Sequence, residues 1–260
     1  MTRGISKTLV FDARNVADNN ASNWSFIYTT SLVKDPRWNL GDKVVLPDGR
    51  AFRYSKSAAA CLPTRGAEST LLGYTAYTVL AVSASAGDTS FTVPAATHAP
   101  LAEDELRGGY VIIWNDADSQ SEFRQILGNT AAAANAAFVV YLDGPLSANL
   151  VAATAACETY KSPYASMQTG TSVALSKLGV PAVYVSAANT YFWLQVAGPR
   201  FCDPQASLTG KERGFAWRHD GSIDDLDNGI EDDASVASVV GGHLITGTAD
   251  GNGPLIMLQE

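Results

Sequence analysis

The sequence predicts an all-β protein, with two β-sandwich-like or barrel-like modules that follow an extended N-terminal arm and few short helices. Short runs of β-branched and aromatic residues alternate with Gly, Pro and Asp about every ten residues, a spacing typical of sandwiches and barrels. Helix signals are weak, because the Ala-rich segment 131–137 is long enough for only one marginal turn. A Lys-Ser-Pro-Tyr stretch at 161–164 divides the chain, so we expect an arm over 1–37 and modules over 38–160 and 161–260.

The expected arm is polar but carries spaced apolar residues. Its segment 18–24 (DNNASNW) cannot bury enough apolar surface to fold by itself. Phe11, Trp24 and Phe26 are candidate anchors along it. The sequence leaves open whether the arm lies across its own body or across a neighbouring subunit.

Residues 41–55 (GDKVVLPDGRAFRYS) predict a β-hairpin at the start of the first module. The Asp-Gly dipeptide is a strong hairpin turn signal, and the proline before it ends the first strand. Alternation places Arg50 and Phe52 on one face of the second strand and Arg53 on the other. We expect each arginine either to anchor a neighbouring chain or to face solvent.

Further strands are expected wherever short apolar runs lie between turn residues. The runs occupy 75–82, 90–93, 109–114, 122–127, 138–142, 180–185, 191–196, 235–240 and 255–258.

The composition argues against nucleic acid and membrane partners. Charged residues make up 17% of the chain, below the roughly 25% of an average soluble domain. The 18 Lys and Arg residues are scattered and the net charge is −8, whereas phosphate binding needs clustered basic residues. The N-terminus lacks a signal-peptide core, and no apolar stretch reaches the roughly 18 residues that span a membrane. We expect a soluble protein made in the cytoplasm.

Residues with catalytic or metal-binding potential are few. The three cysteines lack zinc-type spacing, so we expect free thiols that are buried or partly buried, at Cys61, Cys157 and Cys202. We expect the three histidines to be surface or packing residues rather than general bases. They are His98, His219 and His243. No nucleophile elbow, zinc-protease or phosphate-loop motif is present. We therefore expect no enzyme activity, no cofactor and no metal.

The tract 220–233 (DGSIDDLDNGIEDD) concentrates carboxylates. A solvated acidic loop is the interpretation we favour, and a cation site is the alternative, although the tract does not match the EF-hand pattern. An enzymatic interpretation, a polysaccharide hydrolase, needs Asp224, Asp225 or Asp227 to face another carboxylate across a cleft.

Four tryptophans divide into two groups by their sequence neighbours. Trp114 and Trp193 lie in apolar, strand-like runs, where core packing is expected. Trp38 and Trp217 lie in more polar surroundings beside arginines, so we expect them to be exposed. Exposed tryptophans of this kind suit a protein interface or a sugar-binding site.

Several stretches resemble virion structural proteins of tailed bacteriophages. VVLPDGRAFRYSKS (44–57) is similar to the DGR-containing hairpin near the start of those proteins. TSFTVPAATHAPLAEDELRGGYVIIWND (89–116) is similar to their next segment, and LDGPLSANL (142–150) to a strand end. KSPY, GVP and YFWLQVAGP, within 161–199, resemble a later stretch. The resemblance covers about residues 43 to 200 and consists of structural rather than catalytic motifs.

The resemblance implies a capsid decoration, or cement, protein on the exterior of the virion. It implies the major capsid protein as partner and a homo-oligomer, with a trimer favoured. Candidate interface residues are Phe11, Trp24, Phe26, Trp38, Arg50 and Arg53. The alternative is a tail or head-fibre component that binds host glycans through Trp38 or Trp217, and the polysaccharide-acting enzyme is the third interpretation.

Overall fold

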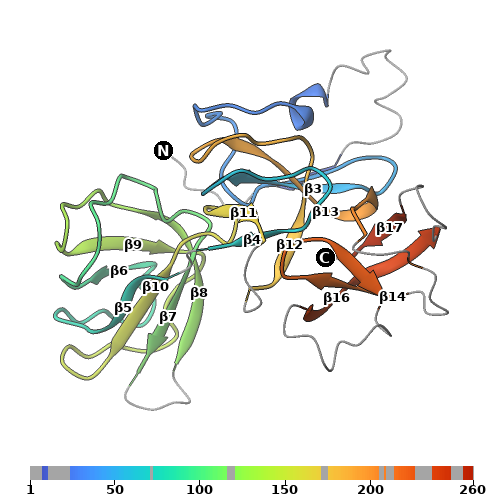
Figure 1. The fold of residues 1–260 in the computed structure, drawn as a ribbon. Helices are drawn as coiled ribbons and strands as arrows, with labels where there is room; N and C mark the ends of the chain where they lie inside the picture. The colour runs from blue at the N-terminus through green and yellow to red at the C-terminus, as the bar shows by residue number, and fades with distance from the viewer. Residues whose placement is uncertain are drawn as a thin grey trace. The chain divides into compact units, whose positions relative to one another are not determined.

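The computed structural model of the chain is built almost entirely of β-strands, which confirms the all-β prediction (Figure 1). Among the described residues, the single helical element is the short 3-10 turn η2 (Ser25–Tyr28), and no helix is long and apolar enough to span a membrane. The structure describes residues 8–10, 24–70, 73–115, 121–170, 175–204, 208, 214–225, 236–246 and 254–259.

The described chain forms two compact units that do not follow the expected division into 38–160 and 161–260. Unit 1 runs from residue 73 to residue 163, and unit 2 combines the residues before and after it. The cause is the antiparallel pairing of β3 (Ala51–Lys56) with β13 (Tyr191–Phe201), which are far apart in sequence. Local sequence patterns carry no information on such a pairing, so the insertion of unit 1 into unit 2 was not predicted.

Unit 1 is a single antiparallel sheet with the strand order β5-β10-β7-β8-β9-β6 (Figure 1). Its six strands are β5 (Gly73–Val79), β6 (Ser90–Val93), β7 (Tyr110–Trp114), β8 (Glu122–Asn129), β9 (Phe138–Leu142) and β10 (Ala156–Tyr160). The predicted runs 90–93 and 138–142 coincide with β6 and β9, which pair with each other.

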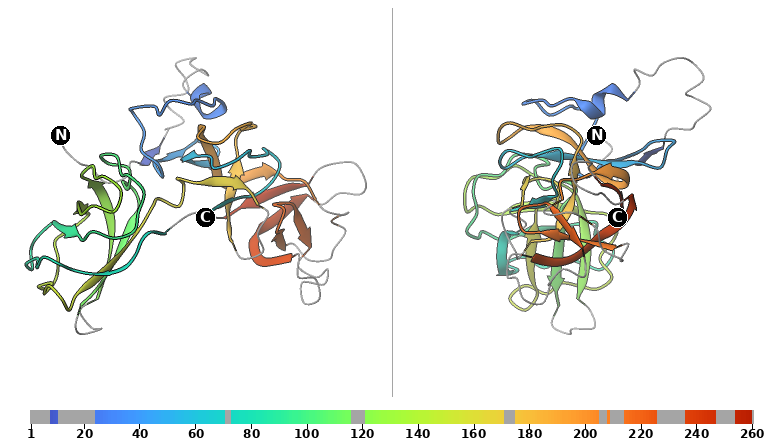
Figure 2. Two further views of the ribbon diagram at one scale, coloured as in Figure 1. Left: turned by 60° about the vertical axis from the view of Figure 1, so that its left-hand side comes forward. Right: turned by 45° about the vertical axis from the view of Figure 1, so that its right-hand side comes forward.

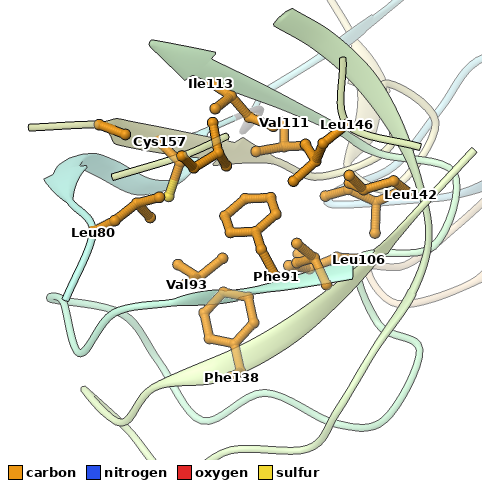
Figure 3. Packing of buried hydrophobic residues seen from close by; sticks show 14 of the residues in the cluster. Leu80, Phe91, Val93, Leu106, Val111, Ile113, Phe138, Leu142, Leu146 and Cys157 are labelled. Atoms are coloured by element: carbon orange, nitrogen blue, oxygen red, sulfur yellow. The ribbon is translucent and has the colours of Figure 1, made fainter. Parts of the chain in front are cut away.

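One side of this sheet encloses the core of unit 1. Figure 3 shows Phe91 of β6 and Phe138 of β9 directed into an interior that Val111 and Cys157 reach from β7 and β10. These side chains are buried. Burial of each large apolar side chain among them stabilises the fold by roughly 1.5–3 kcal/mol. The Ala-rich segment 131–137 is a connecting loop, as expected.

Unit 2 contains the remaining eleven strands of the described residues, which Figure 2 shows from two further directions. The first five are β1 (Thr8–Val10), β2 (Lys43–Val45), β3, β4 (Ala67–Ser69) and β11 (Met167–Thr169). The others are β12 (Lys177–Pro181), β13, β14 (Gly214–Arg218), β15 (Ile223–Asp225), β16 (Val236–Thr246) and β17 (Leu255–Leu258). The main path of the sheet is β1-β2-β3-β13-β17-β16-β14-β15, with β4 joined to β11 and β12.

The predicted hairpin is present as β2 and β3. Val44 pairs with Phe52, and the turn passes through Gly49 at a φ of +86°. Glycine adopts this left-handed conformation without the strain that a side chain introduces, so the Asp-Gly signal located the turn correctly.

Candidate functional site

An apolar surface lies on the outward side of the unit 1 sheet. Val111 and Ile113 of β7 are buried in the core, so strand alternation directs Tyr110, Ile112 and Trp114 to the opposite side. Strand β7 is therefore apolar on both sides. Its outward side chains are only half-buried by the other described residues.

Neighbouring strands add aromatic side chains beside β7. Phe123 of β8 pairs with Ile112, and Tyr160 of β10 pairs with Tyr110. Phe123 is 62% exposed and Tyr77 of β5 is 58% exposed, which are large fractions for side chains of this size. We call the following set the aromatic face: Tyr77, Tyr110, Ile112, Trp114, Phe123 and Tyr160.

The rings of the aromatic face are arranged in two contacting pairs. Tyr110 and Phe123 stack with a centroid distance of 5.0 Å and an interplanar angle of 13°. Tyr77 and Trp114 lie 5.2 Å apart at 51°. Their strands are separated by β10, where the residue that pairs with Trp114 is Ala156. A small side chain at that position lets the two rings meet above the intervening strand.

A hollow of about 270 Å³ opens beside the stacked pair. It is lined by Tyr110, Ile112, Phe123, Tyr160, Lys161 and Pro163. The Lys161 ammonium is paired with Glu105 at 2.9 Å and lies 5.0 Å from the ring centre of Tyr74. Burial, together with the hydrogen bond and the charge of the neighbouring Glu158 carboxylate, raises the pKa of Tyr160.

This arrangement is suited to binding rather than to bond breaking. Exposed, closely spaced aromatic rings give a partner a large apolar contact area at a small entropic cost. The charged groups at the edge, Lys161 and Glu158, are few. None of the residues predicted from the sequence to form an interface belongs to the aromatic face. The available signal was the run YVIIW, in which both sets of alternating residues are apolar.

Two of the tryptophan predictions were wrong. Trp38 is only 7% exposed, because its ring contacts Trp193 at 4.9 Å. Trp217 is 3% exposed and contacts Phe215 at 5.3 Å. Polar sequence neighbours do not report burial when an aromatic side chain lies on the inward side of a turn or strand. Trp193 is buried as expected, whereas Trp114 is half-buried on the aromatic face.

The candidate anchors of the arm contact their own unit. Phe26, in η2, stacks on Trp38 at 5.6 Å and meets Trp193 edge-on at 5.4 Å. Trp24 packs against the same cluster. The segment that follows residue 23 therefore lies across its own body. Phe11 lies outside the described residues.

The two arginines of the hairpin also have partners within the chain. Arg50 forms an ion pair with Asp48 at 2.6 Å and donates to the hydroxyl of Tyr28 at 2.8 Å. Arg53 donates to a backbone carbonyl at 2.8 Å and lies 5.5 Å from the ring centre of Tyr164. Both side chains are half-buried, so each is held in place before any neighbouring chain binds.

The described part of the acidic tract is more structured than the expected solvated loop. It enters strand β15, where Asp224 is buried and paired with Arg218 at 2.8 Å. Asp220 pairs with Arg65 at 2.8 Å. Burial raises the pKa of Asp220, but hydrogen bonds from Ser222 and the Arg65 charge outweigh it and leave the pKa lowered.

The rest of the tract, including Asp227, lies outside the described residues, as does the side chain of Asp225. The partner recorded for the Asp224 carboxylate is the Arg218 guanidinium. Within the described residues, no group of three or more potential ligands is arranged to hold a metal ion.

The remaining residues with reactive potential are the cysteines and the histidines. The three thiols are free and buried, as expected, and burial raises the pKa of each to about 12: Cys61, Cys157 and Cys202. The ring nitrogens of His98 lie 2.6 and 2.8 Å from the carbonyl oxygens of Ala99 and Ala136, so this histidine is a packing residue. His243 is exposed, and His219 is half-buried in a turn.

Comparison with known protein families, with curated proteins and with solved structures finds no match for this chain.

Proposed function

We propose that this chain is a non-enzymatic structural protein of a tailed-phage particle. It binds the major capsid shell as a decoration or cement protein, on the exterior of the capsid, after synthesis in the host cytoplasm. The observation that carries the proposal, beside the resemblance over residues 43 to 200, is the aromatic face of unit 1. A surface of this kind, on a chain with only 17% charged residues, has the composition of a protein-binding site.

Repetition on a shell makes such a surface effective. A decoration protein occurs in many copies, so modest contacts at each copy sum through avidity. We further propose that the chain assembles as a homotrimer, in which each copy presents the same aromatic face. No nucleic acid, membrane, cofactor or metal takes part in this function.

The proposal is tested on particles purified by density gradient from the cells in which the chain is naturally made. Antibody against the chain, carrying gold, should label the capsids of intact particles, and mass spectrometry should find the chain at a constant ratio to the major capsid protein. Recovery of the chain only from the particle-free fraction would contradict the proposal. Light scattering of the purified chain tests the trimer separately, and a monomeric mass over a range of concentrations would contradict it.

A glycan-binding tail or head-fibre component is the second candidate. The specific observation in its favour is the stacked Tyr110–Phe123 pair beside a hollow of about 270 Å³ with Lys161 at its edge. The apolar face of a sugar ring packs on aromatic rings, and the charged group can bond its hydroxyls. Saturation-transfer NMR with glucose, galactose and N-acetylglucosamine tests this candidate, and Phe123→Ala should abolish any transfer.

The former sugar-binding candidates do not support this second function. Trp38 and Trp217 are buried, so neither ring is available for a sugar. The polysaccharide-acting enzyme has less support than the glycan-binding protein. That interpretation needs Asp224 to face a cleft, whereas Asp224 is buried and paired with Arg218.

A further inference from the structure

Three polar side chains meet in the interior of unit 2. Gln168 of β11 pairs in register with Glu68 of β4, and Glu68 pairs on its other side with Lys177 of β12. Residues paired across neighbouring strands project to the same side of a sheet, so the three side chains form one row with the carboxylate in the middle.

The carboxylate of Glu68 bridges its two neighbours. One oxygen accepts a hydrogen bond from Nε2 of Gln168 at 3.1 Å, and the other accepts one from Nζ of Lys177. The same Nζ donates to the backbone carbonyl of His219 at 2.9 Å. The carboxamide and the amine are therefore held by one acid group, which touches a nitrogen atom of each.

The surroundings of the row are closed and tightly packed. The side chains of Glu68 and Lys177 have an exposed fraction of 0%. Gly170 lies so near that a Cβ at this position would overlap Nζ of Lys177. Gly66 lies against the Trp217 ring and against Cβ of Lys177 in the same way. Both glycines are required for this close approach of backbone to the lysine side chain.

Complete burial limits what the lysine can react with. No external substrate reaches Nζ, so a lysine nucleophile in this position can attack only a group of its own chain. A buried ion pair is also expensive in desolvation, and its conversion to a neutral amide bond beside a protonated Glu68 removes both charges from the interior. Gln168 is half-buried, which gives a small leaving group a route to solvent.

We propose that Lys177 and Gln168 are joined by an intramolecular isopeptide bond that forms once unit 2 has folded. A proton passes from Nζ of Lys177 to Glu68, and the lone pair of Nζ attacks Cδ of Gln168. Glu68 delivers one proton to Nε2, the Cδ–Nε2 bond breaks, and the group leaves as ammonia. One of the two protons that Nζ releases leaves with the ammonia, and the other stays on Glu68, so the product holds a neutral acid beside a neutral amide bond. The step is redox-neutral and consumes no further reactant.

In this reaction the fold supplies the effective concentration of the two groups. Lys177 and Gln168 are placed on either side of one carboxylate by backbone pairing, which replaces an encounter in solution. Glu68 acts as a catalytic residue because it touches both nitrogen atoms that exchange protons. The bond then ties β11 to β12 across β4. This inference does not depend on the proposed function.

Mass spectrometry of the intact full-length chain tests the proposal. The expected mass is lower than the sequence mass by one ammonia. After tryptic digestion, Lys177 should be resistant to cleavage and should appear in a branched peptide joined to Gln168. A chain with the full sequence mass and a digest with free Lys177 would overturn the proposal and leave an ion pair only.

Variants assign the roles. Lys177→Arg keeps a positive charge but has no amine that can form this bond, and Glu68→Gln keeps the size of the side chain but cannot carry the proton. Both should restore the full sequence mass. The matched control is Lys161→Arg in unit 1, which should keep the loss of ammonia. Persistence of the loss in Lys177→Arg would overturn the assignment. The wild-type measurement decides the question even if a variant fails to fold.

Discussion

The two units use aromatic side chains in opposite ways. In unit 2, the cluster of Phe26, Trp38, Tyr54 and Trp193 is assembled by close ring contacts, and three of its members are buried. In unit 1, the aromatic face has comparable ring contacts, but Phe123 and others remain in contact with solvent. Ring-to-ring packing alone therefore does not distinguish a core from a binding surface.

The difference lies in what covers each surface. Segment 24–38 contributes Phe26 and Trp38 to the unit 2 cluster, and Figure 2 shows η2 on one side of the strands of that unit. No described residues bury the outward side of the unit 1 sheet in this manner. The unit 2 cluster therefore maintains the fold, whereas the aromatic face is available to a partner.

The largest expected effect is on the buried cluster. Trp193→Ala should lower the free energy of unfolding by about 3–5 kcal/mol, because it removes a fully enclosed ring that contacts Trp38 and Tyr54. Urea denaturation measures this change. Trp114→Ala, at a half-buried ring of unit 1, is the matched control and should lose much less. Equal losses in the two variants would contradict the contrast between the units.

Loss of the Phe26 ring, which segment 24–38 contributes to the unit 2 cluster, should have the next largest effect on stability. Phe26→Ala should lower the free energy of unfolding by about 1–3 kcal/mol, since the ring is half-buried and loses part of its contact with Trp38 and Trp193. Thermal denaturation followed by tryptophan fluorescence checks it. An unchanged midpoint would show that the segment does not stabilise its own body, and would favour contact with a neighbouring subunit.

Acid should destabilise unit 1 through Glu122. Burial raises the pKa of Glu122, but hydrogen bonds from the side chain and amide of Ser147, with Arg124, outweigh it and leave the pKa below its ordinary value of 4.5. A group whose pKa is lowered by folding stabilises the protein above its unfolded-state pKa, and that contribution is lost as the pH falls through the folded-state pKa.

The free energy of unfolding, measured in urea at pH 7 and pH 3, should therefore fall less with acid in Glu122→Gln than in the wild type. Glu103→Gln, at an exposed glutamate of the same unit, is the control and should follow the wild type. If Glu122→Gln lost as much stability in acid as the wild type, Glu122 would not be a source of the acid sensitivity.

The smallest effect on stability is expected at the aromatic face itself. Tyr77→Ala and Phe123→Ala should each change the free energy of unfolding by no more than about 0.5 kcal/mol, because both side chains are more than half exposed. Urea denaturation at neutral pH is the measurement. A loss as large as that of Trp193→Ala would mean that these rings belong to the core of unit 1.

Local patterns in the sequence predicted local structure well. The Asp-Gly turn, the β2–β3 hairpin and strands β6 and β9 follow from turn residues and from apolar alternation. The pairing of β3 with β13 depends on contacts between distant residues, which is why the insertion of unit 1 was missed. Trp38 was misjudged for the same reason, since its burial is caused by Trp193.

The aromatic face was only partly accessible to sequence reasoning. The strand of Tyr110 was predicted and is apolar at every position, which is a recognisable signal for a two-sided strand. The pairing of β7 with β8 and β10 decides which aromatic residues join it, and that pairing is tertiary information. The row of Gln168, Glu68 and Lys177 was equally hidden, because it draws on three strands.

Binding to particles tests the central claim, that the aromatic face of unit 1 is the contact with the capsid shell. The measurement is co-sedimentation of the purified chain with phage particles stripped of their own copies. The wild type should saturate the particles, and the Tyr77→Ala/Phe123→Ala double variant should bind at least about tenfold more weakly, as expected for loss of central aromatic contacts. Phe201→Ala, at an exposed phenylalanine of unit 2, should bind as the wild type does. Undiminished binding of the double variant would contradict the claim.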